Sequence, residues 1–249
     1  MLYSVIIPAR YASERFPGKP LADLNGKPLI QHVYEQAKKV HDHVYVATDD
    51  GRIMDAVRAF GGEAILTSAT HRSGTDRCAE AARILCDSGS GMDIIINLQG
   101  DEPFIQPEQI RLLMGCFLEE GTQIATLANP VKNEQEIHDP NVVKVVTAAG
   151  HHALYFSRSP IPFIRKAGQG NFLKHFPFLK HIGIYAYRYA VLQEITRLPV
   201  SALEKAESLE QLRWLENGYR ILVKVTEAEN IGIDTPEDLE QARVRFANG

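Results

Sequence analysis

The sequence has few cysteines and no long apolar run. Its three cysteines, Cys78, Cys86 and Cys116, form no CxxC pair, which argues against a disulfide framework and against a structural zinc site. No stretch approaches the roughly 18 apolar residues that cross a bilayer. The N-terminus lacks the basic segment and the cleavage site of a signal peptide. We therefore expect a cytoplasmic protein without a membrane segment, since free thiols suit a reducing compartment.

The excess of charge is also small. The chain carries 27 Lys+Arg against 31 Asp+Glu, a net charge of −4, which excludes the broad basic surface of a nucleic-acid or membrane-binding protein. With 45% apolar residues among 249, the chain has enough material for a folded core. The sequence contains no internal repeat and no linker-like segment, so we predict a single domain over residues 1–249.

The first half alternates between apolar runs and helical patterns. Four apolar runs indicate strands, and helical spacing of apolar residues follows each of them. The predicted strands are Leu2–Ile7, His43–Ala47, Ala64–Thr67 and Asp93–Leu98. The last of these contains three consecutive isoleucines, which is typical of a strand buried on both faces. This alternation predicts the α/β class, with a doubly wound, mostly parallel sheet.

The second half is richer in strands and less regular, so we interpret it as a β-rich insertion. A mobile loop is expected over Arg165–His175, where glycine and polar residues gather. A single helix is predicted over Leu203–Glu216, with Trp214 in the core. The remaining predicted elements are strands at Val142–Thr147, Ala153–Ser157, His181–Tyr187 and Ile221–Val225, and a last helix capped by Thr235.

The loop after the first strand, residues 8–20, is the strongest functional signal. It carries three cations, Arg10, Arg15 and Lys19, at the edge of the sheet where open α/β folds bind ligands. Gly18 allows a close backbone approach, and arginine and lysine both suit phosphate groups. The alternative is a solvated basic loop. The pattern is neither GxGxxG nor GxxxxGK[ST], which disfavours dinucleotide binding and a Walker-type ATPase.

Two acidic segments suggest a magnesium site. Asp101 follows the isoleucine strand within Gln99–Pro103, and a carboxylate at a strand tip beside a phosphate loop is a good Mg²⁺ ligand. Asp234 ends another short apolar segment and could share the metal. Either acid could instead be an ordinary turn or capping residue.

The segment His71–Arg77 precedes an alanine-rich helix. Ser73 and Gly74 lie where free backbone N–H groups at a helix N-terminus favour anions or the edge of a base. Capping of the helix by Thr75 is an alternative that is compatible with that function. The nine histidines show no metal-ligand spacing, and no Ser-His-Asp or Cys-His order is evident.

These residues together resemble the sugar nucleotidyltransferases, and among them the cytidylyltransferases that use 3-deoxy-manno-octulosonate (Kdo). The resemblance begins with Arg10-x-x-Ser-x-Arg15-x-Pro-Gly-Lys19-Pro and covers nearly the whole chain, with Arg165–Lys174 the least similar stretch. The other matching motifs are Val46–Asp49, His71–Arg77, Gln99–Pro103, Asn141–Val146, Tyr155–Arg158, His181–Tyr185, Leu209–Arg213 and Gly232–Leu239.

The resemblance implies a GT-A-like fold, usually a homodimer, in which the insertion serves dimerisation and sugar binding. The implied reaction joins CTP and Kdo to give CMP-Kdo and pyrophosphate, for lipopolysaccharide synthesis. The implied catalytic residues are Arg10, Lys19, Asp101 and Asp234, of which Asp101 and Asp234 would hold Mg²⁺. The implied nucleotide-binding residues are Ala9, Arg10, Arg15, Lys19, Ser73, Gly74, Arg77, Gln99 and Asp101. The implied sugar-binding residues are Arg158, His181, Tyr185, Glu210 and Gln211.

Three alternatives stay open at this point. A cytidylyltransferase for another acidic sugar, such as a sialic acid or an amino-Kdo, would share the nucleotide loops and differ near Arg158–Glu210. A non-catalytic nucleotide-binding module on the same fold would bind without turnover. A glycosyltransferase with Asp101-Glu102 as its metal motif would consume a CMP-sugar instead of forming it.

Overall fold

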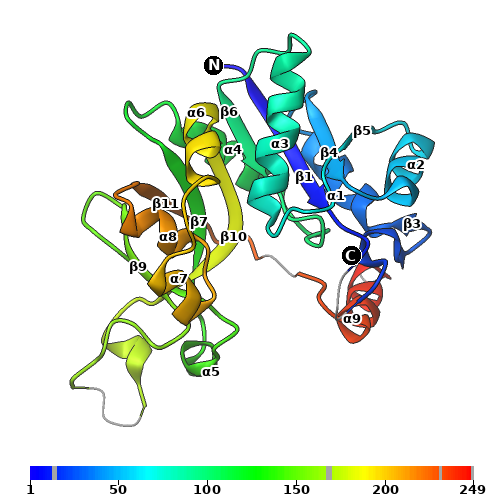
Figure 1. Ribbon diagram of the computed structural model, residues 1–249. Helices are drawn as coiled ribbons and strands as arrows, with labels where there is room; N and C mark the ends of the chain where they lie inside the picture. The colour runs from blue at the N-terminus through cyan, green and yellow to red at the C-terminus, as the bar shows by residue number, and fades with distance from the viewer. Residues whose placement is uncertain (13–15, 167–169, 230–231, 248–249) are drawn as a thin grey trace. The chain divides into compact units, whose positions relative to one another are not determined.

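Four strands of the first half form the parallel sheet that their apolar runs predict. The computed structural model describes residues 1–12, 16–166, 170–229 and 232–247. The strands lie in the order β6 (Ile94–Asn97), β1 (Tyr3–Ala9), β4 (Val44–Thr48) and β5 (Glu63–Leu66), and every neighbouring pair is parallel (Figure 1). Because β4 and β6 are buried along their whole length, both faces of this sheet are covered. The predicted α/β class with a mostly parallel sheet is confirmed.

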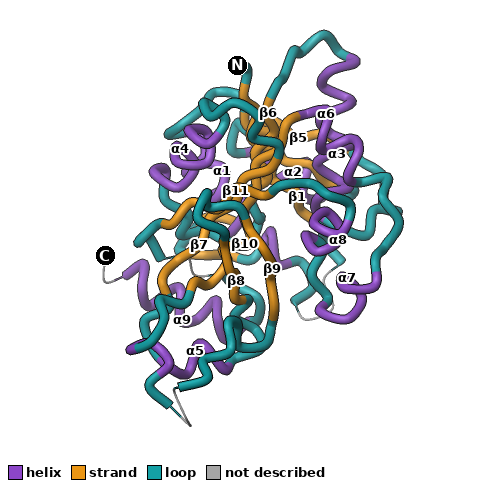
Figure 2. The backbone as a smooth tube through the Cα atoms, turned by 90° about the vertical axis from the view of Figure 1, so that its left-hand side faces the viewer, coloured by secondary structure: helices purple, strands orange, loops and turns teal. Residues whose placement is uncertain are grey.

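Helices cover both faces of this sheet. Helices α1 (Leu29–Lys38) and α2 (Gly51–Ala59) follow β1 and β4 and lead toward β5, at one end of these four strands. Helix α3 (Gly74–Asp87) leads back from β5 to β6, at the other end. Because crossovers between parallel strands are right-handed, connections that run in opposite directions along the sheet place their helices on opposite faces of the sheet. Figure 2 shows α1 and α3 on the two sides of the strands. This arrangement gives the doubly wound pattern expected from the sequence.

These elements belong to the first of two compact units. The first unit comprises Met1–Arg111, Arg188–Thr196 and the described residues of 232–247, and the second comprises Leu112–Tyr187 and Arg197–Glu229. Helix α4 (Pro107–Cys116) contains one of the boundaries between the units. The prediction of a single domain is not tested by this division and stays a prediction.

The first unit also contains further elements outside this four-stranded sheet. They are the 3₁₀ helix η1 (Lys19–Leu21), β2 (Asp23–Leu24), β3 (Lys27–Pro28), α6 (Tyr189–Ile195) and α9 (Pro236–Ala247). Asn25 and Gly26, both in the left-handed conformation, form the turn between β2 and β3. Ile233 and Leu239 pack with Leu24 and Leu29, so the segment before α9 is fixed against the β2–β3 hairpin.

The second unit is rich in strands, as predicted. Its sheet contains β11 (Ile221–Val225), β7 (Ile124–Pro130), β10 (Leu179–Arg188), β8 (Lys144–Thr147) and β9 (Ala153–Ser157). β11 and β7 are parallel, and the remaining pairs, β7–β10, β10–β8 and β8–β9, are antiparallel. Trp214 is 1% exposed, which confirms its place in the core.

The prediction of one helix over Leu203–Glu216 is wrong. The structure has two short helices, α7 (Ala202–Glu207) and α8 (Gln211–Glu216), separated by Ser208 in the left-handed conformation. Contacts of Glu207 with β9 compete with local helix propensity here: its carboxylate accepts hydrogen bonds from the Ser157 hydroxyl and the Arg158 N–H.

Three further elements in the second half of the sequence were not expected, although one of them belongs to the first unit. They are β7, α5 (Glu134–His138) and the short α6 of the first unit. The expected loop over Arg165–His175 contains the 3₁₀ helix η2 (Phe172–Lys174), and its residues 167–169 lie outside the described residues. Phe172 packs on a small core of Val131, Ile137 and Phe178. Across the described ranges, no helix combines the length and apolar character needed to cross a membrane.

Candidate nucleotide and sugar sites

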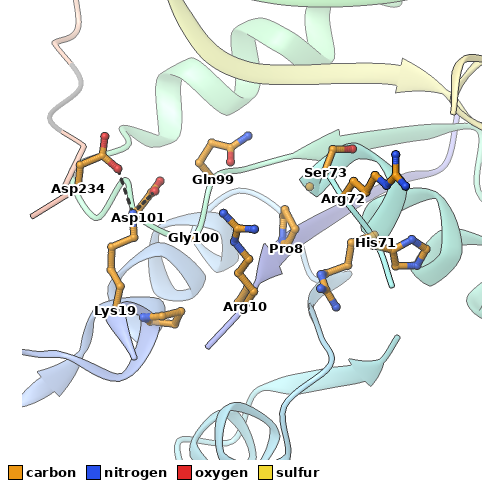
Figure 3. A pocket seen from close by; sticks show the side chains of 14 residues that line it. Pro8, Arg10, Lys19, His71, Arg72, Ser73, Gln99, Gly100, Asp101 and Asp234 are labelled. Carbon is orange, nitrogen blue, oxygen red and sulfur yellow. Dashed lines mark hydrogen bonds and ion pairs between the residues drawn. The ribbon is translucent and has the colours of Figure 1, made fainter. Parts of the chain in front are cut away.

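A cavity of about 500 Å³ opens at the carboxyl ends of β1 and β6. The register between these two strands brings the loop after Ala9 and the loop after Asn97 to the same edge of the sheet. The cavity is lined by Pro8, Ala9, Arg10, Lys19, Pro20, His71, Arg72, Ser73, Gly74, Arg77, Gln99, Gly100, Asp101 and Asp234. All of these residues belong to the first unit. Figure 3 shows several of their side chains facing the same space.

The basic loop is folded sharply where it enters η1. Gly18 has a φ of 74°, and a Cβ atom there would lie 3.1 Å from the ring of Tyr11, so the position requires glycine. The Gly18 N–H donates to the Tyr11 carbonyl, which closes the base of the loop. Arg10 is exposed at the end of β1, and its guanidinium points toward Gln99 and Gly100 (Figure 3). Arg15 lies outside the described residues.

The two predicted metal carboxylates face the same lysine. Lys19 Nζ lies 2.6 Å from Asp101 Oδ2 and 3.2 Å from Asp234 Oδ1 (Figure 3). The Ile233 N–H donates to the Asp101 carbonyl at 2.9 Å, which fixes the two acidic segments together. Thr235 and Asp238 then cap α9 reciprocally, because each side chain accepts from the other's backbone N–H. Residues far apart in the sequence are thus brought to one point.

This pair of carboxylates suits Mg²⁺ better than a metal that needs a full protein cage. Among the described residues, no group of three or more His, Cys, Asp or Glu side chains is close enough to hold a metal. Magnesium commonly uses one or two carboxylates and completes its shell with phosphate oxygens and water. Asp101 and Asp234 already converge on one cation, the ammonium of Lys19, and their side chains are 31% and 50% exposed. The donor set therefore fits Mg²⁺ bound together with a phosphate ligand.

The other side of the cavity is formed by the N-terminus of α3. Ser73 caps this helix, with its hydroxyl accepting from the Asp76 N–H at 3.1 Å, so the alternative of capping by Thr75 is wrong. Arg77 is buried, and its guanidinium donates to Thr67 Oγ1 at 2.6 Å and pairs with Asp49 at 3.3 Å. Arg77 therefore reaches the cavity wall with much of its donor capacity already used.

Sequence reasoning missed two further residues of this wall. His71 and Arg72 both line the cavity, although only Ser73, Gly74 and Arg77 of their motif were singled out. Arg72 could have been found from its position, since a cation one residue before a helix cap lies beside an anion site. Nothing in the sequence distinguishes His71 from the other histidines.

Two of the five predicted sugar residues form an aromatic group in the second unit. His181 and Tyr185 lie 5.2 Å apart between ring centres, with Phe156 and Trp214 against their outer sides. His181 Nε2 lies 3.0 Å from the Thr126 hydroxyl, which itself donates to the Ile184 carbonyl at 2.7 Å. Because that hydroxyl has one proton, His181 must donate through Nε2. Burial lowers the pKa of His181 to about 3, so its ring is neutral and Nδ1 is an acceptor.

Tyr185 presents a polar group in the same surroundings. Its hydroxyl is buried and has no hydrogen-bond partner among the described residues. Burial raises the pKa of this phenol well above its ordinary value, and the nearby charge of Glu210 adds to the effect. A buried hydroxyl without a partner costs free energy unless a ligand or water satisfies it.

Arg158 directly follows β9, Glu210 is the N-cap of α8, and Gln211 is the first residue of α8. The Arg158 side chain donates from Nε to the Glu207 carbonyl at 2.7 Å and from Nη1 to the Pro140 carbonyl at 2.9 Å. Glu210 pairs with Arg213 at 3.3 Å, and Gln211 is buried at the first turn of α8. All five predicted sugar residues belong to the second unit, whereas the described nucleotide residues belong to the first.

A family model described as cytidylyltransferase matches residues 4–224. The chain belongs to the cytidylyltransferase family. Among its curated relatives, the 3-deoxy-manno-octulosonate cytidylyltransferase of Parabacteroides distasonis is 60% identical over 252 residues, covering 100% of this chain and 99% of the relative. The protein of the same name from Bacteroides thetaiotaomicron is 55% identical over 251 residues, with the same coverage of both chains.

Solved structures agree with this family assignment. A CMP:2-keto-3-deoxy-manno-octonic acid synthetase complexed with CTP superimposes with a TM-score of 0.91 at 46% identity, covering 100% of this chain and 99% of that one. A 4-diphosphocytidyl-2C-methyl-D-erythritol synthase from Anaerococcus prevotii has a TM-score of 0.62 at 14% identity, covering 99% and 98%, and shares the fold alone. The family match makes this chain a nucleotidyltransferase, and the cation-rich cavity is its candidate nucleotide site.

Proposed function

We propose that this cytidylyltransferase transfers CMP from CTP to Kdo, releasing pyrophosphate and forming CMP-Kdo for lipopolysaccharide synthesis. The observation that carries the proposal is the cavity in which Lys19 meets Asp101 and Asp234 beside Arg10. Full-length relatives with 55–60% identity that carry the name of this reaction support it, and so does the similar structure complexed with CTP.

The reaction needs positioning and charge neutralisation more than covalent chemistry. A hydroxyl of the sugar attacks the α-phosphorus of CTP and loses its proton to solvent. The bond from the α-phosphorus to the oxygen that bridges to the β-phosphate breaks, and pyrophosphate leaves. Arg10, Arg15 and Lys19 neutralise the triphosphate and the departing pyrophosphate. Asp101 and Asp234 would hold Mg²⁺, which would neutralise phosphate oxygens and polarise the reacting phosphorus.

The cytidine half of the nucleotide is assigned to the wall formed by β1, β6 and α3. Ala9 ends β1 and Gln99 follows β6, and Ser73, Gly74 and Arg77 lie at the start of α3. Backbone N–H groups at this helix end and the Gln99 amide can donate to or accept from a base. This assignment rests on the cavity lining and on the family resemblance.

The sugar is assigned to the second unit. The neutral His181 offers Nδ1 as an acceptor, and Tyr185 offers an unsatisfied hydroxyl, which together suit the hydroxyl groups of a sugar. Glu210 and Gln211 add polar groups, and Arg158 is the cation proposed to pair with the sugar carboxylate. We also propose a homodimer, located in the cytoplasm where CTP is available, without a nucleic-acid or membrane partner.

A pyrophosphate-release assay with CTP, Mg²⁺ and a panel of acidic sugars tests the proposal. Faster pyrophosphate release with Kdo than with sialic acid or amino-Kdo is the expected result. If another acidic sugar is preferred, the proposed substrate would be wrong and the proposed CMP transfer would still hold. CTP binding by calorimetry without turnover on any sugar would instead show a non-catalytic nucleotide-binding module.

A further inference from the structure

Helix α3 holds the loop that precedes it through two charged side chains three residues apart. Glu80 Oε2 accepts from the Ser68 N–H at 2.7 Å, and Arg77 Nη1 donates to the Ser68 carbonyl at 3.4 Å. Arg77 also donates to the Thr67 hydroxyl at 2.6 Å. Both polar groups of the Ser68 backbone are therefore bound by the same helix face, since residues three apart on a helix are neighbours.

Glu80 makes a second contact farther along the same loop. His71 Nε2 lies 2.5 Å from Glu80 Oε2, the oxygen that also accepts from Ser68. Burial raises the pKa of Glu80, but the hydrogen bonds from Ser68 and His71 outweigh it and leave the pKa below its ordinary value. The carboxylate is thus ionised at neutral pH and forms charge-assisted hydrogen bonds, which are stronger than neutral ones.

The loop held in this way forms part of the cavity wall. His71, Arg72 and Ser73 line the cavity, and the Ser73 hydroxyl fixes the far end of the loop by capping α3. Residues 68–73, which we name the 68–73 loop, are therefore anchored at Ser68, His71 and Ser73. Glu80 binds the first two of these residues, and Arg77 also binds Ser68. Glu80 itself is absent from the described residues that line the cavity.

We propose that Glu80 is a positioning residue for the nucleotide, which fixes the 68–73 loop in the geometry that binds CTP without touching CTP itself. This inference rests on the proposed function, in that the cavity beside the loop is the CTP site. A loop that is not anchored must lose conformational freedom when the ligand binds, and that cost lowers affinity. The loop faces the base side of the cavity and not Lys19, so the effect falls on binding more than on turnover.

Variants Glu80→Ala and Glu80→Gln test the proposal through steady-state kinetics and CTP binding by calorimetry. We expect Glu80→Ala to raise the KM and Kd for CTP by about tenfold or more, the effect of losing hydrogen bonds to a charged group. In the same variant, turnover and the KM for the sugar should each stay within about threefold of the wild-type value. Glu80→Gln keeps an acceptor oxygen and should recover part of the CTP affinity.

A matched control and a double variant separate positioning from stability. Asp87→Asn removes another carboxylate of α3, which pairs with Arg83 at 3.2 Å on the exposed surface, and should leave the CTP affinity unchanged. If Glu80 acts through His71, then the effects of His71→Asn and Glu80→Gln on CTP affinity will be less than additive. Thermal unfolding of every variant shows how much stability each substitution removes.

The outcomes distinguish this inference from the proposed function. Wild-type protein that does not bind CTP would overturn the proposed function. Wild-type binding together with unchanged CTP affinity in both Glu80 variants would overturn the inference alone, even if the melting temperature falls. An equal loss of affinity for CTP and sugar would overturn it as well. Should Glu80→Ala fail to fold, Glu80→Gln and the double variant still decide the question.

Discussion

Lys19 Nζ lies 2.6 Å from Asp101 Oδ2, and this ion pair links the basic loop of residues 8–20 to one of the two carboxylates proposed to hold Mg²⁺. Asp234 completes the arrangement at 3.2 Å. The Lys19 side chain is 12% exposed, whereas both carboxylates are more open, so a ligand can approach the acids more readily than the ammonium. Mg²⁺ bound to these oxygens and the ammonium of Lys19 would compete for the same negative charge. We therefore expect Lys19 to exchange a carboxylate for a phosphate oxygen when Mg²⁺ and CTP bind.

Lys19→Ala tests this exchange in two independent measurements. Without the ammonium, the carboxylates should bind Mn²⁺ more tightly in the absence of nucleotide, as measured by electron paramagnetic resonance. Turnover should nevertheless fall by at least about tenfold, or ~1.4 kcal/mol of barrier, because a cation beside the leaving pyrophosphate helps most in the transition state.

Lys38→Ala serves as the control for Lys19→Ala. Lys38 is a surface lysine of α1 near Asp42, and its removal should change neither measurement. If Lys19 acted only by attracting CTP over a distance, Lys19→Ala would weaken CTP binding in a strongly salt-dependent way and leave turnover intact. That result would remove Lys19 from the catalytic residues.

Asp101→Asn keeps the shape of the side chain and removes its charge. We expect turnover to fall by roughly 100-fold or more, the scale of losing one strong electrostatic stabiliser. Chelation by EDTA should abolish the activity of the wild-type protein, and added Mg²⁺ should restore it. Asp42→Asn, in which an exposed acid near Lys38 is changed, provides the control. Near-normal turnover of Asp101→Asn at saturating Mg²⁺ would contradict the metal assignment.

The sequence predicts the nucleotide half of the molecule well because its signals are local. Apolar runs define the strands. The basic loop follows β1 and Asp101 follows β6, which places both at one edge of a parallel sheet. The sequence predicts that Asp234 could share a metal with Asp101, but no local pattern determines that both acids meet Lys19. This convergence depends on the packing of Ile233 against Leu24 and Leu29, a contact between distant segments.

The second half is predicted less well because its structure depends on long-range contacts. The break at Ser208 follows from the bonds of Glu207 to β9, and helix propensity contains no information about them. The same holds for Lys144, a buried lysine whose ammonium donates to the carbonyls of Asp139, Val142 and Arg158. Burial lowers the pKa of Lys144, and no spacing rule would place this residue in a core.

Arg158→Lys tests whether this arginine binds the sugar or only supports the turns. The guanidinium already donates to the carbonyls of Glu207 and Pro140, so the substitution should lower the free energy of unfolding by about 1–2 kcal/mol. If Arg158 also binds the sugar carboxylate, the KM for the sugar should rise more than the KM for CTP, because lysine cannot reproduce the planar fork.

Arg220→Lys, at an exposed arginine of the same unit, is the control for Arg158→Lys. It should change neither KM value and should leave the free energy of unfolding within about 0.5 kcal/mol of the wild-type value. Equal increases in the KM for both substrates of Arg158→Lys would assign Arg158 a structural role alone.

His181 should make the folded protein sensitive to acid. Its pKa is about 3 in the folded protein, because burial disfavours the charged ring, and near 6.5 when the chain is unfolded. Between these values the unfolded chain binds a proton that the folded chain does not, so the free energy of unfolding falls as the pH falls. From pH 6.5 to pH 4.5 this one group contributes a loss of about 2 kcal/mol.

Urea unfolding of wild-type and His181→Asn protein at pH 6.5 and 4.5 measures this contribution. We expect the variant to be less stable than the wild type at pH 6.5, because the bond to Thr126 is altered, and to lose less stability on acidification. His175→Asn, at an exposed histidine of the same unit, should keep the full acid sensitivity of the wild type. If His181→Asn and the wild type lose the same free energy between the two pH values, then His181 does not stay neutral in the folded protein. The lowered pKa from which the neutral ring of His181 is inferred would then be wrong.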